Sequence, residues 1–433
     1  MSNKLVYVAM CGDIIHYGHV NIINEAAKLG EVVVGLHSDE VVSSLMRLPI
    51  LSYEERKRVI ENIKGVSRVI PQETLDQVPN LRLIKPDYVV HGTDWCQGPD
   101  KYLRDRVVEA VKEWNGQVVD IPYTEGVSLD KLNDLIVHLG TTDVRRGALR
   151  KLLAVHKHVR VLEAHNGLTG LIVEKTKMNE NGKVKEFDAM WVSSLCDSTA
   201  KGKPDIELVD VTSRLNTINE IMEVTTKPII VDGDTGGRIE HFTYTVKSLE
   251  RVGVSAIIIE DKVGLKKNSL FGTGAQQTQD TIEGFCEKIR AGKRAQVSSD
   301  FMIFARIESL ILKQGMDDAI ARAKAYIEAG ADGIMIHSID KSGQEIFDFL
   351  KLYNKFENRR PLAIVPTAYN SIYEQDLYDA GVNIIIHANH LLRSGYKAMS
   401  QCALNILQNE RSKDCDDMCL SIKEILTLID VEK

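Results

Sequence analysis

Three stretches of the chain share one pattern, and this pattern decides the fold: ERVGVSAIIIED (residues 250–261), IEAGADGIMIHS (327–338) and YDAGVNIIIHAN (378–389). In each stretch a helical segment ends near a glycine, an apolar strand follows, and polar residues come after the strand. Gly253, Gly330 and Gly381 suit the left-handed position just beyond the end of a helix. The pattern predicts repeated helix-to-strand units of an α/β protein.

Eight short apolar runs extend this pattern outward, and helical segments separate most of them. They are Val159–Glu163, Ala189–Val192, Pro228–Asp234, Ala256–Lys262, Phe301–Glu308, Gly333–Ser338, Pro361–Thr367 and Asn383–Asn389. Eight strand–helix repeats predict a (β/α)8 barrel. We place this domain at residues 145–433, with further helices after Tyr396.

The first 140 residues also alternate strand and helix. Leu5–Met10, Val32–Leu36, Tyr88–Val90 and Val118–Ile121 are expected strands, and a helix ending at Gly30 follows the first of them. This alternation predicts a Rossmann-like domain with a parallel sheet covered on both faces. A basic helical stretch, Arg145–Lys157, comes next, and we expect a helix to join the two domains.

Composition narrows the function classes. The net charge of −7 argues against a general nucleic-acid binder. No apolar run reaches the ~18 residues of a membrane span, and the first residues do not resemble a signal peptide. The seven cysteines are scattered, which favours reduced thiols over a disulfide framework. We therefore expect a cytoplasmic globular protein that binds neither membranes nor nucleic acid.

Polar side chains follow the apolar runs of the predicted barrel. Catalytic groups of such barrels lie at the carboxyl ends of the strands, where the loops converge. Asp232, Asp234 and Glu260 are three carboxylates that follow neighbouring strands, and a hard cation such as Mg²⁺ would relieve their mutual repulsion. The alternative is that they pair with Lys262 and Arg306.

Other residues at the same ends are suited to an anionic substrate. Arg306 and His337 can bind carboxylate or phosphoryl oxygens, and the turn at Ser193, Ser194 and Leu195 offers backbone N–H groups. The segment Gly264–Gly274 contains Lys266, Lys267, Asn268 and Ser269 between glycines, a composition typical of an active-site lid. A surface loop without function is the alternative reading.

Taken together, several motifs of the barrel resemble phosphoenolpyruvate mutase, of the isocitrate lyase superfamily. They are EAHNGLTGLIV (163–173), WVSSLCDS (191–198), VDGDTGG (231–237), EDKVGLKKNS (260–269), Arg306-x-Glu308 and MIHS (335–338). The lid lacks the catalytic cysteine of the superfamily's lyases. Phosphonopyruvate hydrolase is a nearer alternative, but Lys266 and Asn268 are similar to the mutase pattern.

The resemblance implies isomerisation of phosphoenolpyruvate to 3-phosphonopyruvate, with Asp232 binding Mg²⁺ directly and Asp234 and Glu260 acting through its waters. Further implied roles concern residues that touch the substrate or the transferring phosphoryl group: Trp191, Ser193, Ser194, Leu195, Asp205, Lys266, Asn268, Ser269, Arg306 and His337. A loose, metaphosphate-like transfer needs positioning, positive charge and exclusion of water. Asp205 as a covalent nucleophile remains an alternative.

The first strand–helix turn of the N-terminal domain contains His16-Tyr-Gly-His19. Two imidazoles beside a helix N-terminus suit a polyphosphate, and Gly18 lets the backbone approach it. With HGTDW (91–95) and YTEGVS (123–128), this motif resembles the glycerol-3-phosphate and choline-phosphate cytidylyltransferases. The resemblance implies that His16 and His19 stabilise the leaving pyrophosphate of CTP. It also implies nucleotide or phosphate contacts from Gly18, Arg56, Asp94, Trp95, Thr124 and Ser128.

These readings combine into a bifunctional enzyme of phosphonate biosynthesis. The barrel makes the C–P bond, and the N-terminal domain uses CTP to activate a phosphonate such as 2-aminoethylphosphonate or 2-hydroxyethylphosphonate. The alternative is a phosphonopyruvate hydrolase or another lyase of the superfamily, fused to a nucleotide-binding module without transferase activity. The resemblance also implies a homo-oligomer, dimer or tetramer, and a phosphonopyruvate decarboxylase as pathway partner.

Overall fold

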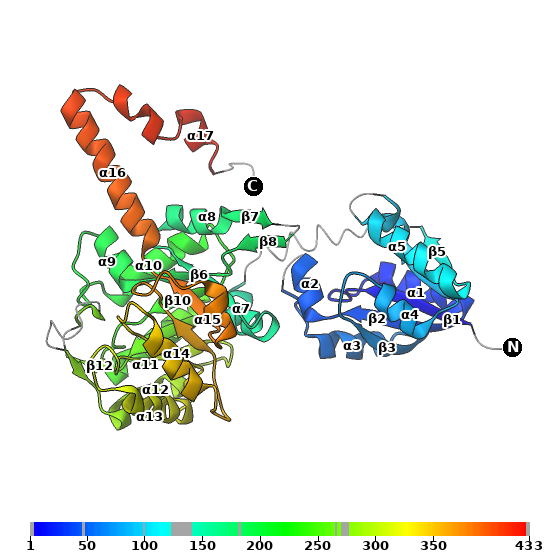
Figure 1. Cartoon of the computed structure of the whole chain (residues 1–433), viewed down its shortest axis with the longest axis horizontal. Coiled ribbons are helices and arrows are strands. Elements are labelled where there is room, and N and C mark those ends of the chain that lie inside the picture. Colours follow the sequence, from blue (N-terminus) through cyan, green and yellow to red (C-terminus); the bar gives the residue numbers. More distant parts are fainter. Residues whose placement is uncertain are drawn as a thin grey trace. The chain divides into compact units, whose positions relative to one another are not determined.

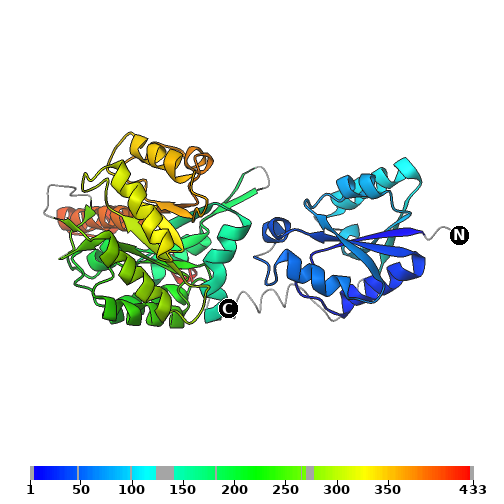
Figure 2. The same cartoon turned by 90° about the horizontal axis from the view of Figure 1, so that it is seen from below.

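Two compact units make up the chain, Met1–Leu139 and Gly140–Lys433 (Figures 1 and 2). The computed structural model describes residues 4–45, 48–97, 100–122, 141–180, 183–264, 266–269 and 277–429. Each unit is an α/β domain, as the alternation of strands and helices predicts.

The N-terminal unit contains a five-stranded parallel sheet with the order β3-β2-β1-β4-β5. Its strands are β1 (Leu5–Met10), β2 (Glu31–His37), β3 (Val66–Gln72), β4 (Tyr88–Gly92) and β5 (Gln117–Ile121). Its helices are α1 (Tyr17–Leu29), α2 (Asp39–Leu45), α3 (Tyr53–Glu61), α4 (Val78–Ile84), η1 (Thr93–Cys96), α5 (Lys101–Val111) and η2 (Lys112–Trp114). The chain changes direction between β1 and β4, the switch point where such sheets bind ligands.

Apolar side chains of β1 point alternately to the two faces of this sheet. Val6, Val8 and Met10 pack with Ile23 of α1 in one core cluster. Tyr7 and Ala9 pack with residues of α4 and α5 in a second cluster. Both faces are therefore covered, as predicted for a parallel sheet.

One strand was not expected from the sequence. β3 has the sequence VSRVIPQ, and only Val69 and Gln72 of it are buried. It lies at the edge of the sheet, where a proline such as Pro71 is tolerated because one side of the strand needs no hydrogen-bond partner. Its polar residues and its proline conceal the apolar signal that marks the other strands.

The second unit contains the predicted closed barrel of eight parallel strands, in the order β10-β11-β14-β15-β16-β17-β6-β9. The strands are β6 (Val159–Glu163), β9 (Ala189–Val192), β10 (Ile229–Asp232), β11 (Ala256–Glu260), β14 (Met302–Ile307), β15 (Gly333–Ile336), β16 (Leu362–Ile364) and β17 (Ile384–His387). Each lies within one of the eight apolar runs. The barrel closes where β17 pairs with β6, with Ile385 opposite Arg160.

Helices surround the barrel (Figure 2). They are α7 (Thr142–Val155), α8 (Gly167–Lys175), α9 (Ser194–Ala200), α10 (Val211–Met222), α11 (Ile239–Val252), α12 (Ile282–Ala295), α13 (Met316–Glu328), α14 (Gln344–Tyr353) and α15 (Glu374–Asp379). Two hairpins, β7 (Lys177–Glu180) with β8 (Lys183–Glu186) and β12 (Lys262–Val263) with β13 (Thr278–Gln279), extend from it. Gly253, Gly330 and Gly381 have φ of 93°, 105° and 112°, the left-handed backbone predicted for them.

Helix α7 corresponds to the basic stretch that we expected to join the domains. It belongs to the barrel unit, as the predicted domain boundary at residue 145 implies. The guanidinium of Arg145 donates to the carbonyl oxygens of Thr225 and Met222 at 2.5 and 3.1 Å, which fastens α7 to the end of α10. Residues 123–140, between the sheet and α7, lie outside the described part of the chain.

The chain continues past the barrel as α16 (His390–Asn409), η4 (Lys413–Met418) and α17 (Ile422–Leu426). Helix α16 extends away from the barrel (Figure 1), and none of its residues is buried. We call α16, η4 and α17 the C-terminal arm. Across the described ranges, no helix has the length and apolarity needed to cross a membrane.

Candidate active sites

A cavity of about 70 Å³ lies at the mouth of the barrel, where the strands end. Polar residues line most of it, and four further lining residues were not assigned roles from the sequence: Val365, Thr367, Ala388 and Asn389. The predicted site residues that line it are Trp191, Ser193, Ser194, Leu195, Asp205, Asp232, Glu260, Lys266, Asn268, Ser269, Arg306 and His337. The structure therefore gathers all the predicted barrel residues except Asp234 around one cavity.

Two side chains of the predicted lid reach across this cavity to a single carboxylate. The Lys266 ammonium lies 2.8 Å from Asp205 Oδ1, and Asn268 Nδ2 donates to Asp205 Oδ2 at 3.1 Å. Lys266 also donates to Ser194 Oγ at 2.5 Å. Residues 266–269 thus lie over the cavity in a closed position.

Ser269 fixes the other side of the lid to the barrel. Its hydroxyl donates to Glu308 Oε2 at 2.5 Å and accepts hydrogen bonds from Arg306 at 2.7 Å and Lys262 at 2.9 Å. Lys262 also donates to the carbonyl oxygen of Lys267 at 3.1 Å. Charged residues of β12 and β14 therefore bind residues 266–269 of the predicted lid.

The three carboxylates predicted to bind a cation have different partners. Asp232 accepts from the backbone and hydroxyl of Ser194 at 3.2 and 2.7 Å. Glu260 lies 3.2 Å from Lys262 and 3.4 Å from Arg306, which is the pairing weighed as the alternative. One oxygen of Glu260, Oε1, is nevertheless buried without a hydrogen bond.

Asp234 departs from the predicted arrangement. Its backbone has a φ of 53°, in the left-handed region, within a turn where Gly236 and Gly237 also have positive φ. Its carboxylate pairs with Arg214 at 3.1 Å and with Lys266, and it does not line the cavity. No three acidic, histidine or cysteine side chains of the described residues converge as ligands of a metal ion. The positive charge among these carboxylates comes from lysine and arginine.

Burial and charge give the carboxyl groups different pKa values. Burial, together with the nearby Glu308, raises the pKa of Glu260 to about 7 even though Arg306 opposes this shift. Burial would also raise the pKa of Asp232, but Lys266, Arg306 and the hydrogen bond from Ser194 lower it to about 2. At neutral pH, Asp232 is thus a fixed negative charge, while Glu260 can hold or release a proton.

Arg306 and His337 form a cationic and polar wall of the cavity. Arg306 Nε donates to Glu308 Oε1 at 2.6 Å, and its Nη2 lies 2.9 Å from His337 Nδ1. Burial and the neighbouring guanidinium lower the pKa of His337, so its imidazole is neutral. Glu308 orients both groups, and together they present donors to an anionic ligand.

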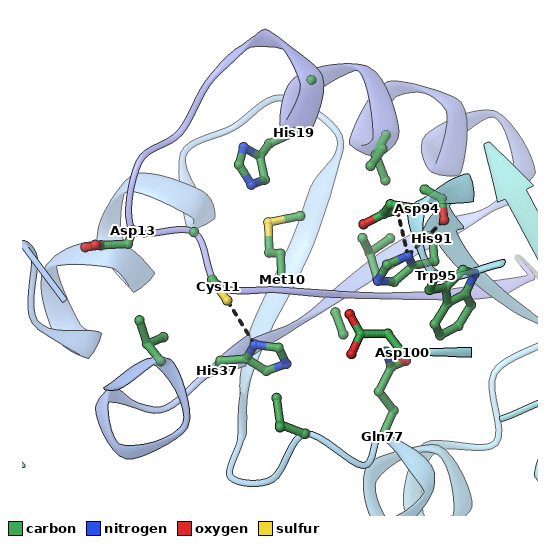
Figure 3. A pocket seen from close by; sticks show the side chains of 18 of the residues that line it. Met10, Cys11, Asp13, His19, His37, Gln77, His91, Asp94, Trp95 and Asp100 are labelled. Carbon is green, nitrogen blue, oxygen red and sulfur yellow. Dashed lines mark hydrogen bonds and ion pairs between the residues drawn. The ribbon is translucent and has the colours of Figure 1, made fainter. Parts of the chain in front are cut away.

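A second cavity, of about 340 Å³, lies in the N-terminal unit at the carboxyl ends of its strands (Figure 3). Among the predicted residues, His16, Gly18, His19, Asp94 and Trp95 line it. Thr124 and Ser128 lie outside the described residues. The residues of this cavity that lie outside the quoted motifs include His37, Gln77 and Asp100, and His91 of HGTDW lines it as well.

The two histidines of the HxGH motif cap helix α1 reciprocally. His16 Nδ1 accepts from the backbone of Gly18 at 3.1 Å, and His19 Nδ1 accepts from the backbone of His16 at 3.4 Å. Burial and the nearby His16 lower the pKa of His19 to about 4. Since Nδ1 accepts in each ring, the proton of the neutral imidazole is on Nε2. His16 Nε2 is buried without a hydrogen bond, so its N–H can donate to a ligand.

Arg56 does not occupy the predicted position. It is fully buried beneath the cavity and does not line it. Its guanidinium donates to the carbonyl oxygens of Cys11 and Leu51 at 2.5 and 3.2 Å and to Asp39 at 2.6 Å. Three of its five N–H donors are used in this way, and the fully buried side chain does not reach the cavity in which the predicted phosphate contact was placed.

Trp95 and Asp94 lie on the opposite wall, after β4. The indole of Trp95 is stacked on His91 with ring centroids 4.0 Å apart, and its Nε1 donates to Asp120 at 2.7 Å. Asp94 lies 3.5 Å from His91 Nδ1. Trp95 is therefore held in place in the cavity wall. The imidazole of His91, which also lines the cavity, is stacked on its indole.

Comparison with known proteins supports the identification of both domains. The family model described as phosphoenolpyruvate phosphomutase matches residues 149–407, and a cytidylyltransferase-like model matches residues 11–147. The chain belongs to the phosphoenolpyruvate phosphomutase family, and a cytidylyltransferase-like domain precedes its barrel.

Particular relatives illustrate this membership. A phosphoenolpyruvate phosphomutase of Tetrahymena pyriformis is 36% identical over 62% of this chain and 85% of its own length. The crystal structure of phosphoenolpyruvate phosphomutase from Streptomyces platensis subsp. rosaceus matches with a TM-score of 0.59 and 34% identity, over 65% of this chain and 93% of that one. A phosphonopyruvate hydrolase in complex with oxalate and Mg²⁺ matches with a TM-score of 0.58 and 32% identity, over 66% and 94%.

Proposed function

We propose that the barrel converts phosphoenolpyruvate to 3-phosphonopyruvate and that the N-terminal domain transfers a cytidylyl group from CTP to a phosphonate. The observation that carries the first part is the closed lid, in which Lys266 and Asn268 hold Asp205 over a cavity walled by Arg306 and His337. This arrangement combines positive charge with exclusion of water.

In the proposed reaction the phosphoryl group leaves the enol oxygen of phosphoenolpyruvate, and the methylene carbon of the same molecule captures it. The electron pair of the breaking P–O bond remains on the enolate, and the new P–C bond uses the enolate's carbon. Arg306 and Lys266 offset the charge on the phosphoryl oxygens, while the lid keeps water away from phosphorus. The backbone N–H of Leu195 would donate to the substrate's carboxylate, because that of Ser194 donates to Asp232.

Mg²⁺ is the proposed cofactor of the barrel. Asp232 and Glu260 line the cavity, and Glu260 Oε1, which is ion-paired with Lys262 but forms no hydrogen bond, could accept one from a metal-bound water. The hydrolase structure that contains oxalate and Mg²⁺ supports the same choice. Asp232 would hold the ion directly and Glu260 would act through its waters, whereas Asp234 would first have to exchange its ion pairs with Arg214 and Lys266. When bound, the ion supplies stabilisation of negative charge on the enolate oxygen.

Phosphorus NMR of the full-length chain tests both activities. With Mg²⁺ and phosphonopyruvate, we expect the phosphonate resonance to be replaced by that of phosphoenolpyruvate, because the O–P ester is favoured at equilibrium. With CTP and either 2-aminoethylphosphonate or 2-hydroxyethylphosphonate, we expect a CMP adduct and pyrophosphate. Phosphate and pyruvate in place of phosphoenolpyruvate would instead identify a hydrolase, and CTP binding without pyrophosphate would identify a binding module.

The proposed mutase equilibrium disfavours phosphonopyruvate, so we expect a partner enzyme in the pathway. An enzyme that removes phosphonopyruvate irreversibly, such as a decarboxylase, would draw the isomerisation toward the phosphonate. Phosphonopyruvate must also lose its carboxylate before it becomes the proposed acceptor of the cytidylyl group. The two activities are therefore separate steps of one pathway.

A homo-oligomer is also proposed, through the C-terminal arm. Leu407 and Leu426 are 77% and 72% exposed, and Ile422 is 74% exposed. Apolar side chains on an extended helical segment favour association with a second copy.

Light scattering should show a dimer or tetramer for the natural chain and a smaller species for the Leu407→Glu, Leu426→Glu double variant. Val297→Glu, at a 90% exposed site on the barrel, is the control, and an unchanged mass for the double variant would contradict the proposal.

A further inference from the structure

The proposed role of His16 and His19 in binding CTP phosphates leaves other polar residues of the N-terminal cavity without an assigned role. They include Gln77, Asp100 and His37. Figure 3 shows Gln77 pointing into the cavity toward Asp100, on the side away from His19.

Gln77 is buried but incompletely bonded. Its side chain is 6% exposed, and its Oε1 has no hydrogen-bond partner. It precedes α4, yet its side chain does not cap that helix. A buried carbonyl oxygen without a donor is costly, so this position favours a ligand that brings an N–H or O–H group.

The three aspartates that line the cavity differ in their partners. Asp13 accepts hydrogen bonds from the backbone of Ile50 and Leu51, each at 3.0 Å. Asp94 lies 3.5 Å from His91. Asp100 neither caps α5 nor forms an ion pair with any of the described residues. Asp100 is an exposed side chain that lines the cavity, so its charge can meet a ligand there.

Lys101 and Arg104, the cationic residues that follow Asp100 on α5, do not line the cavity, and Arg104 pairs with Asp120. The described residues that line the cavity include no lysine or arginine, since Arg56 is bonded beneath it. Burial, Arg56 and His91 lower the pKa of His37 to about 4, so its ring is neutral at physiological pH. Gln77 and Asp100 thus offer oxygen acceptors and one negative charge without a competing cation.

We propose that this side of the cavity binds the ammonium group of an aminoalkylphosphonate, with Asp100 as its counter-ion and Gln77 Oε1 as a hydrogen-bond acceptor. An ammonium has three donors and no acceptor, which matches this pair of groups better than a hydroxyl does. The inference rests on the proposed cytidylyl transfer and narrows its acceptor to 2-aminoethylphosphonate and similar amines. The ammonium takes no part in the reaction, in which a phosphonate oxygen bonds to the α-phosphorus of CTP and pyrophosphate leaves.

Steady-state release of pyrophosphate by the full-length chain tests this selectivity. With CTP and Mg²⁺, the natural chain should use 2-aminoethylphosphonate with kcat/KM at least about tenfold above that for 2-hydroxyethylphosphonate, as expected for one added charge pair. Asp100→Asn and Gln77→Leu should each reduce this ratio, and Asp100→Asn should abolish most of it. Asp105→Asn, which removes an exposed charge from the same helix, should leave the ratio as it is.

The inference would be overturned if the natural chain used the two phosphonates equally or preferred 2-hydroxyethylphosphonate. It would also be overturned if Asp100→Asn left the ratio of kcat/KM values unchanged. Absence of pyrophosphate with both compounds would overturn the proposed transfer instead. In that case calorimetric titration of the two phosphonates into the CTP-bound chain decides the inference. Tighter binding of the amine that depends on Asp100 supports it, and equal binding refutes it.

Discussion

Asp232→Asn is expected to reduce the conversion of phosphonopyruvate to phosphoenolpyruvate by about 10³-fold or more, since a charge fixed at the reacting centre is lost. Asp232 is buried, and its low pKa keeps it ionised. Asparagine has nearly the same shape and can still accept from Ser194, so the fold should persist. The missing charge removes the proposed direct ligand of Mg²⁺ and leaves Lys266 without part of its counter-charge.

Phosphorus NMR at saturating Mg²⁺ measures this loss, and circular dichroism confirms that the barrel is folded. Asp376→Asn makes the same chemical change at an exposed position on α15 and should have natural activity. Pyrophosphate release by the N-terminal domain should be equal in all three proteins. Mutase activity near the natural level in Asp232→Asn would remove Asp232 from the proposed metal site.

His19→Ala is expected to reduce pyrophosphate release by about 10²- to 10³-fold, the usual consequence of removing one donor from a developing negative charge. The neutral ring of His19 carries its proton on Nε2, while Nδ1 serves the cap of α1. Alanine removes both functions. His19→Asn provides the matched control, because its amide oxygen can accept from the backbone of His16 while the Nε2 donor is absent.

Both His19 variants should lose transfer activity, but only His19→Ala should also lose thermal stability, by roughly 1 kcal/mol for a missing cap. The mutase activity of the same preparations should be unaffected, since the barrel is a separate compact unit. Natural rates of pyrophosphate release in His19→Asn would show that the motif binds nucleotide without assisting its cleavage.

The barrel and most of its site could be predicted because both depend on local sequence. Apolar runs fix the strands, and the residue after each run must emerge at the mouth, which placed Asp232, Glu260, Arg306 and His337 together. Strand β3 escaped prediction because an edge strand need not be apolar.

The sequence did not show which charged side chains of the site pair with one another. The left-handed backbone at Asp234 turns its carboxylate toward Arg214 of α10, and nothing in VDGDTGG indicates this direction. Gln77 and Asp100 precede helices and belong to no recognisable motif. Their importance appears only when folding brings the ends of different loops to one cavity.

The buried guanidinium of Arg56 has a consequence for how mutational data on the transferase domain should be interpreted. It joins the chain just after β1, through Cys11, to the segment before α3 and to Asp39 of α2. Replacing it would leave the half-buried carboxylate of Asp39 and two carbonyl groups without this donor, and it should destabilise the domain. A screen that scored only product formation would rank variants of Arg56 beside those of His19. A melting curve would show that the Arg56 variant has lost stability, whereas His19→Asn has lost only the group that assists pyrophosphate release.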